Sequence, residues 1–86
     1  MKKLWSDDAW EEYLYWQTTE KKVIKKINEL IRCIEREGAM KGIGKPEPLK
    51  YRKGYSRRID DTNRLAYDIE DNILYIYSCL GHYEDK

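Results

Sequence analysis

The 86-residue chain contains no phenylalanine, only two cysteines and a single histidine, and no long apolar run. A membrane-spanning helix needs about eighteen consecutive apolar residues, and no apolar stretch follows the N-terminal lysines, so we expect neither a membrane span nor a signal peptide. Cys33 and Cys79 lack the close spacing of a zinc site or a disulfide framework, and both are expected to be reduced core residues. The expected location is the cytoplasm.

Aromatic area comes instead from three tryptophans and eight tyrosines, whose rings carry a polar edge that needs a partner. Such rings also stack on nucleobases. A domain of this length has room for one small core, since it buries only about 60 to 65% of its unfolded surface. We therefore expect a single domain over residues 1–86.

Charge is unevenly distributed along the chain, although the formal net charge is only +1. Residues 1–40 carry eight basic and eight acidic side chains, residues 41–64 carry eight and three, and residues 65–86 carry one and five. The middle segment is therefore +5 and the last segment −4. A basic block between neutral and acidic segments indicates a local anion site rather than general attraction to a polyanion.

Two helices are expected in the first half of the chain. Ser6 is a plausible N-cap for a helix that runs to about Trp16, with two aspartates in its first turn. Thr18 or Thr19 can cap a second helix, whose apolar residues recur at spacings of three and four. That helix should stop at Gly38.

Strands are expected at the N-terminus and in the second half of the chain. Residues 2–5 could form an edge strand, and residues 55–60, 64–69 and 73–79 show the composition of strands joined by short turns. Short turns predict an antiparallel meander, in which the strand over residues 73–79 is central and covered by helices on one face. The predicted fold is α+β, with two N-terminal helices packed on a small antiparallel sheet.

A carboxylate lies between two prolines in the loop that separates the helices from these strands. Each proline fixes its own φ and disfavours helix at the residue before it, so Glu47, between Pro46 and Pro48, should sit on a stiff extended backbone. A stiff backbone suits a catalytic base, although Glu47 could also simply cap a loop.

Cations and the single histidine follow this loop. Arg58 and Arg64 should come close across a hairpin, where two guanidinium groups repel unless an anion lies between them. The alternative, equally open from the sequence, is that Arg57 points to solvent and the other two pair with carboxylates. His82 is the natural proton donor to a leaving group, but a lone histidine is more often structural or exposed.

Together these residue types predict one reaction. If Glu47, His82 and the arginines face one phosphodiester, Glu47 could take the proton of an RNA 2′-hydroxyl that attacks the adjacent phosphate. His82 would then protonate the departing 5′-oxygen, while cations neutralise the transition state. The reaction is confined to RNA, because DNA has no 2′-hydroxyl, and it requires neither a metal nor a cofactor.

The chain also resembles the YoeB (Txe) family of bacterial toxins within the wider RelE-type group, over essentially residues 2–83. Six segments match in order: Leu4-Trp5-Ser6, Tyr13-Leu14-Tyr15-Trp16-Gln17, Lys25-Lys26-Ile27-Asn28-Glu29-Leu30-Ile31, Gly44-Lys45-Pro46-Glu47-Pro48-Leu49-Lys50, Ser56-Arg57-Arg58-Ile59 and His82-Tyr83. The resemblance implies a RelE-like fold and an endoribonuclease that cuts messenger RNA in the A site of the 70S ribosome. It also implies a YefM-type antitoxin as the inhibitor, contact with operator DNA only through that antitoxin, and no membrane partner.

The resemblance carries over roles residue by residue. Glu47 is similar to the family's general base, His82 to its general acid and Arg64 to the residue that stabilises the scissile phosphate. Further RNA or phosphate contacts are expected from the remaining candidates, which are Lys45, Lys50, Tyr55, Arg57, Arg58 and Tyr83.

Three departures from the family pattern are expected to alter base stacking or substrate preference, or to weaken RNA affinity. Tyr55 stands where the family usually has tryptophan, in a segment that looks one residue shorter, and Asn63 replaces a common histidine before Arg64. Residues 84–86, Glu-Asp-Lys, extend beyond the usual final tyrosine and add two acids near His82.

Two other classes of function stay open at this level. The chain could be a binding module without turnover, acting with an antitoxin as a repressor or occupying the ribosome, and its modest net charge and acidic end favour that alternative. The basic loop could instead be a solvated face and the aromatics a core. Exposed aromatics suit self-association, but no pattern fixes a homodimer.

Overall fold

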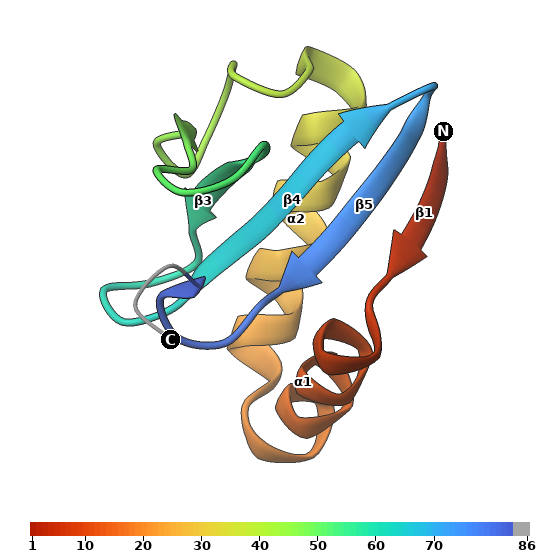
Figure 1. The fold of residues 1–86 in the computed structure, drawn as a ribbon. Helices are drawn as coiled ribbons and strands as arrows, with labels where there is room; N and C mark the ends of the chain where they lie inside the picture. The colour runs from red at the N-terminus through yellow and green to blue at the C-terminus, as the bar shows by residue number, and fades with distance from the viewer. Residues whose placement is uncertain (84–86) are drawn as a thin grey trace.

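Two helices and five strands make up the structure, a computed structural model that describes residues 1–83. In chain order they are β1 (Lys2–Trp5), α1 (Asp7–Thr19), α2 (Lys21–Glu37), β2 (Glu47–Pro48), β3 (Tyr55–Arg58), β4 (Arg64–Glu70) and β5 (Ile73–Ser78). The strands form one sheet in the order β1-β5-β4-β3-β2, and α2 lies across one face of it (Figure 1). This arrangement confirms the predicted α+β class.

The helix ends match the sequence signals in part. Ser6 caps α1 as predicted, because its hydroxyl accepts from the backbone N–H of Ala9 at 3.0 Å. The helix continues past Trp16 to Thr19, so the prediction that a threonine caps α2 is wrong; the cap is Glu20, which makes no side-chain capping hydrogen bond. The second helix ends at Gly38, as predicted. Neither helix in residues 1–83 is long and apolar enough to cross a membrane.

The sheet is mixed rather than purely antiparallel. β3, β4 and β5 form the predicted antiparallel run, with β2 added antiparallel to β3, but β1 pairs with β5 in parallel. Asp71 and Asn72, both with positive φ, make the two-residue turn between β4 and β5. β5 is flanked on both sides as predicted, although β4 occupies the middle of the sheet.

The core lies between α2 and one face of the sheet. Side chains alternate along a strand, so Leu65 and Tyr67 of β4 and Leu74 and Ile76 of β5 point into this core. Cys33 and Cys79 are buried, and neither forms a disulfide within residues 1–83, as predicted. The opposite face carries no helix, and this open face is where the other half of each strand's side chains gathers.

Candidate active site

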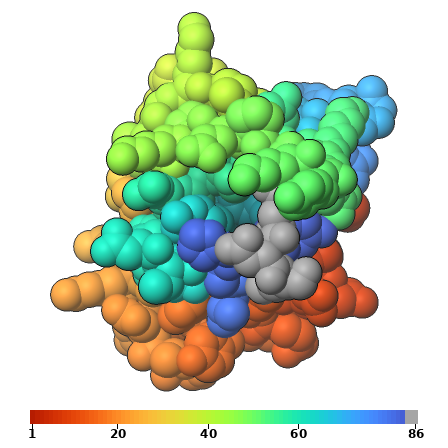
Figure 2. Space-filling view, turned by 60° about the vertical axis from the view of Figure 1, so that its left-hand side comes forward, coloured from red at the N-terminus to blue at the C-terminus, as the bar shows by residue number. Residues whose placement is uncertain are grey.

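A cavity of about 240 Å³ opens on the face of the sheet that the helices leave uncovered. Three parts of the chain meet around it: the segment between α2 and β3, the paired strands β3 and β4, and the chain that follows β5. Their colours run from green through cyan to blue in Figure 2. Nine residues line it: Lys45, Glu47, Lys50, Tyr51, Ser56, Arg58, Arg64, His82 and Tyr83. The cavity thus brings together the predicted base, the predicted acid and four cations.

The electrostatic character of the cavity suits an anion. Four of its lining side chains are cationic and one is a carboxylate, so their formal charge is +3 with a neutral histidine. Guanidinium groups present planar forks of donors that match phosphate oxygens, and lysines add point charges. A phosphate group is the simplest biological anion that such a site would accept.

Glu47 is held by the short strand that the two prolines favour. β2 pairs with β3, which sets Glu47 opposite Ser56. The loop is anchored before it, where the backbone N–H of Arg58 donates to the carbonyl of Gly44 at 2.6 Å, and after it, where the N–H of Leu49 donates to the carbonyl of Gly54 at 2.9 Å. The Glu47 side chain is exposed toward solvent, where a substrate can reach it.

Gly44 is required at its position in this loop. Its φ is +85°, which disfavours any residue with a side chain, and a Cβ there would lie 2.7 Å from Leu30 Cδ2. The close approach lets the loop cross over α2 and turn toward β3.

Arg58 and Arg64 face one another directly across the β3–β4 pair, as the hairpin predicts. The guanidinium of Arg64 donates to the backbone carbonyls of Asp60 at 2.8 Å and Asn63 at 3.2 Å. Among residues 1–83 neither arginine forms an ion pair with a carboxylate. Their charges are therefore available to an anion, as the first of the two alternatives expects.

His82 lies half-buried just beyond β5, and the chain before it is fixed by α1. The carboxylate of Glu12 accepts from the backbone N–H of Cys79 at 2.8 Å and from the Ser78 hydroxyl at 3.1 Å. The indole N–H of Trp16 donates to the carbonyl of Cys79 at 2.9 Å. Helix α1, which is far from His82 in the sequence, thus fixes the position of Ser78 and Cys79, just before the segment that carries His82.

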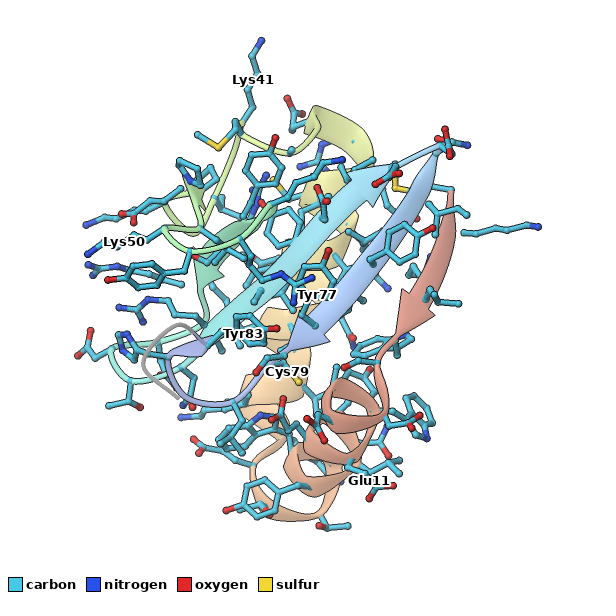
Figure 3. The ribbon with its side chains drawn as sticks, viewed as in Figure 1. Glu11, Lys41, Lys50, Tyr77, Cys79 and Tyr83 are labelled. Atoms are coloured by element: carbon cyan, nitrogen blue, oxygen red, sulfur yellow. The ribbon has the colours of Figure 1, made fainter. Side chains whose placement is uncertain are left out.

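Tyr83 is packed into the wall of the cavity by two residues outside it. Its ring stacks against Tyr77 at 6.0 Å between centroids, and its hydroxyl accepts from the guanidinium of Arg52 at 2.6 Å. That guanidinium also lies 4.0 Å from the centroid of the Tyr77 ring. Figure 3 shows Tyr77 and Tyr83 side by side at the end of β5, with Lys50 on the neighbouring loop.

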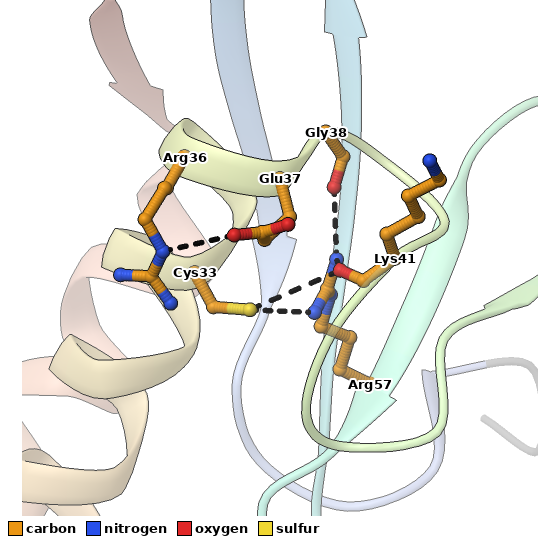
Figure 4. Close-up of polar contacts among 6 residues, drawn as sticks. All are labelled: Cys33, Arg36, Glu37, Gly38, Lys41 and Arg57. Carbon is orange, nitrogen blue, oxygen red and sulfur yellow. Dashed lines mark hydrogen bonds and ion pairs between the residues drawn. The ribbon is translucent and has the colours of Figure 1, made fainter.

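Arg57 does not contact the cavity, and the prediction that it binds phosphate is corrected. Its side chain is fully buried on the helix side of β3, neither in solvent nor near the cavity. Its guanidinium donates to the carbonyls of Gly38 at 2.9 Å, Lys41 at 2.7 Å and Ile43 at 2.8 Å. Figure 4 shows the contact with Gly38. Neighbouring residues of a strand face opposite ways, so Arg57 and Arg58 cannot both reach one anion.

Tyr55 is displaced from the site for the same reason. It shares the helix side of β3 with Arg57 and packs against Tyr67, with ring centroids 5.9 Å apart. Two residues that line the cavity, Tyr51 and Ser56, were not among the sequence candidates. Alternation from Arg58 would have identified Ser56, whereas Tyr51 lies in a loop where no periodicity applies.

The effect expected of residues 84–86 lies outside the described residues. Within residues 1–83 no group of three or more histidine, cysteine, aspartate or glutamate side chains is arranged to hold a metal ion.

The arrangement of two helices on a five-stranded sheet, with a cationic cavity on its open face, is the RelE-like fold. A YafQ mutant from E. coli has this fold, with a TM-score of 0.78 at 14% identity over 96% of this chain and 94% of that one. The sequence model of the YoeB-like toxins of bacterial type II toxin-antitoxin systems matches residues 5–83, and the chain belongs to that family.

Individual relatives agree with this assignment. The chain is 48% identical to toxin YoeB of Escherichia coli K12 over 85 residues, which covers 96% of this chain and all of that one. A crystal structure of the heterotetrameric YoeB-YefM toxin-antitoxin complex from Staphylococcus aureus superposes with a TM-score of 0.90 at 48% identity, covering 96% of this chain and 98% of that one.

Proposed function

We propose that this toxin is an endoribonuclease that cuts messenger RNA in the ribosomal A site by attack of a 2′-hydroxyl on the adjacent phosphate. The observation that carries the proposal is the meeting of Glu47, Arg64 and His82 around one cationic cavity, although 35 positions separate Glu47 from His82 in the sequence. Its cationic lining and the family membership both support it.

Glu47 and His82 take the two proton-transfer roles. Glu47, exposed on a strand fixed at both ends, accepts the proton of the attacking 2′-hydroxyl. His82 donates a proton to the 5′-oxygen as it leaves, which prevents an unstable alkoxide from forming. The bond from the 2′-oxygen to phosphorus forms as the bond to the 5′-oxygen breaks, and the product is a 2′,3′-cyclic phosphate with a free 5′-hydroxyl.

Charge stabilisation falls to the arginines and lysines. Arg58 and Arg64 stand opposite each other across the hairpin, where they can contact the non-bridging oxygens of one phosphate. Lys45 and Lys50 lie in the loop on the other side of the cavity and add positive charge near the flanking phosphates. The reaction needs no metal or cofactor, because acid, base and counter-charge all come from side chains.

We assign the aromatic residues of the cavity to contacts with the nucleobases of the RNA. Tyr83, held by Arg52 and Tyr77, forms one wall, while the side chain of Tyr51 is 81% exposed on another. Exposed rings beside a phosphate site suit stacking on the bases next to the cut.

A YefM-type antitoxin is the proposed inhibitor. The relative from Staphylococcus aureus was solved with YefM bound, and this chain superposes on it over nearly its whole length. An antitoxin segment that folds over the basic cavity would block RNA by occupying the same charges. Operator DNA would be contacted through the antitoxin.

The test is cleavage of translated messenger RNA in a reconstituted translation system. Glu47→Gln and His82→Gln should each lower the cleavage rate by roughly 10² to 10⁴-fold, the usual contribution of general acid or base catalysis. Glu29→Gln removes an exposed carboxylate from α2 and serves as the matched control, with unchanged rate. Ribosome binding without cleavage by the parent protein, or parental rates in both variants, would overturn the proposal.

A further inference from the structure

The turn between β3 and β4 is closed by a single aspartate. Oδ1 of Asp60 accepts from the backbone N–H of Thr62 at 2.9 Å and from that of Asn63 at 2.8 Å, which is the hydrogen-bond pattern of an Asx turn. The turn therefore has a fixed shape although its residues are largely exposed.

The side chain of Asn63 uses both ends of its amide. Nδ2 donates to the two carboxylate oxygens of Asp60, at 3.0 and 3.1 Å, and Oδ1 accepts from the backbone N–H of Gly81 at 2.8 Å. Only a side chain with a donor and an acceptor on one rigid plane makes both contacts. The first contact orients the amide, so that its oxygen faces Gly81.

The same turn also holds Arg64. Its guanidinium donates to the carbonyls of Asp60 and Asn63, and its backbone N–H donates to the carbonyl of Gly81 at 3.0 Å. Both polar backbone groups of Gly81 are thus bound by two consecutive residues, Asn63 of the turn and Arg64 at the start of β4. The next residue in the chain is His82.

We propose that Asn63 is a positioning residue that fixes His82 relative to Arg64, so that the proton donor and the phosphate contact form one rigid unit. The inference rests on the proposed function and adds a residue to it. Acid catalysis requires the donor within hydrogen-bond reach of the leaving oxygen, and a displacement of about 1 Å can cost roughly a hundredfold in rate. Asn63 does not line the cavity, and in this role it acts through the backbone of Gly81.

A pair of complementary substitutions tests this role. Asn63→Asp removes the donor and places two carboxylates against each other, and it should lower kcat for cleavage of ribosome-bound messenger RNA by roughly ten- to a hundredfold with KM little changed. The double variant Asp60→Asn with Asn63→Asp has the same net charge as the parent and restores a donor facing an acceptor. Its kcat should return to within about threefold of the parent. Asp61→Asn, in the same turn and exposed, is the control with parental kcat.

Hydrogen exchange at the Gly81 amide, measured by NMR on the isolated protein, reports the contact without any activity. The amide should be protected in the parent, exchange at least about tenfold faster in Asn63→Ala, and regain protection in the double variant. A cleaving parent whose Asn63→Ala variant keeps full kcat overturns the inference alone, as does a double variant no faster than Asn63→Asp. A parent that cuts no RNA overturns the proposed function and this role with it.

Discussion

Arg57 is fully buried, and its guanidinium is satisfied mainly by carbonyl groups. Its Nε donates to the hydroxyl of Tyr67 at 2.8 Å, and that hydroxyl donates in turn to the carbonyl of Ala39 at 2.6 Å. Burial raises the pKa of Tyr67, partly offset by Arg57, so the phenol stays protonated and can donate. These contacts join the loop after α2 to β3, and this loop leads directly to Glu47.

Replacement of Arg57 separates stability from chemistry. Arg57→Met removes a fully buried guanidinium, leaves several partly buried carbonyls without donors, and should lower the free energy of unfolding by about 3 to 5 kcal/mol. Arg58→Met, its exposed neighbour on the opposite face, should change it by less than about 0.5 kcal/mol while slowing cleavage. Urea unfolding followed by tryptophan fluorescence measures both, and equal stabilities of the two variants would contradict the account.

Tyr83 depends on two residues that do not line the cavity. Tyr77→Leu removes the ring on which Arg52 rests, and exposed cation–π contacts contribute about 0.5 to 1 kcal/mol. We therefore expect cleavage to slow by roughly two- to fivefold, whereas Tyr77→Phe keeps the ring and should match the parent. The comparison of the two rates in one translation assay decides the point, since a slow Tyr77→Phe variant would assign the effect to the hydroxyl instead.

At the scale of elements, the stability that the turn between β3 and β4 contributes should decrease at acid pH. Burial alone would raise the pKa of Asp60, but hydrogen bonds from Asn63 and Thr62 outweigh it, and the pKa lies below its usual value of 3.8. Because the folded chain favours the charged form, the stability that Asp60 contributes is present above about pH 3.8 and is lost as pH falls through the lower folded pKa.

The difference between parent and Asp60→Asn isolates this contribution, since all other carboxylates titrate in both proteins. The gap between their free energies of unfolding should be largest near about pH 6 and should shrink toward about pH 2. A gap that stays constant over this range would show that Asp60 does not supply charge-dependent stability.

Elements whose signals are local could be predicted from the sequence. Ser6 and Gly38 mark helix ends through their own chemistry, and the short turn at residues 60–63 brings Arg58 opposite Arg64 without any knowledge of the rest of the chain. The site follows in large part, because the cations and Glu47 belong to one hairpin and the loop before it.

What could not be predicted depends on pairing across long sequence distances. The parallel pairing of β1 with β5 joins the two ends of the chain, and no local pattern encodes it. The burial of Arg57 and Tyr55 follows from which face of β3 meets α2. Because neighbouring side chains of a strand point to opposite faces, Arg57 and Arg58 do not form one cluster. The contacts of Asn63 with Gly81 and of Arg52 with Tyr83 likewise join segments that only the fold brings together.

At the scale of the whole molecule, the two faces of the sheet have different roles. One face is covered by α2 and holds the core, while the other carries the cavity and its charged side chains. A net charge of only +1 hides a formal charge of +3 on the lining of this cavity. The proposed RNA substrate would therefore meet a concentrated positive site on a nearly neutral protein, and we expect binding to depend on the docking surface of the ribosome rather than on long-range attraction.

The central claim is that Glu47 and His82 act on one linkage through the 2′-hydroxyl of the nucleotide before the cut. The most direct test uses a ribosome-bound messenger RNA in which that single nucleotide is 2′-deoxy, beside an otherwise identical all-ribose message. The account predicts cleavage of the ribose message to a 2′,3′-cyclic phosphate and no cleavage of the deoxy message at that position. Cleavage of both messages at equal rates would contradict it.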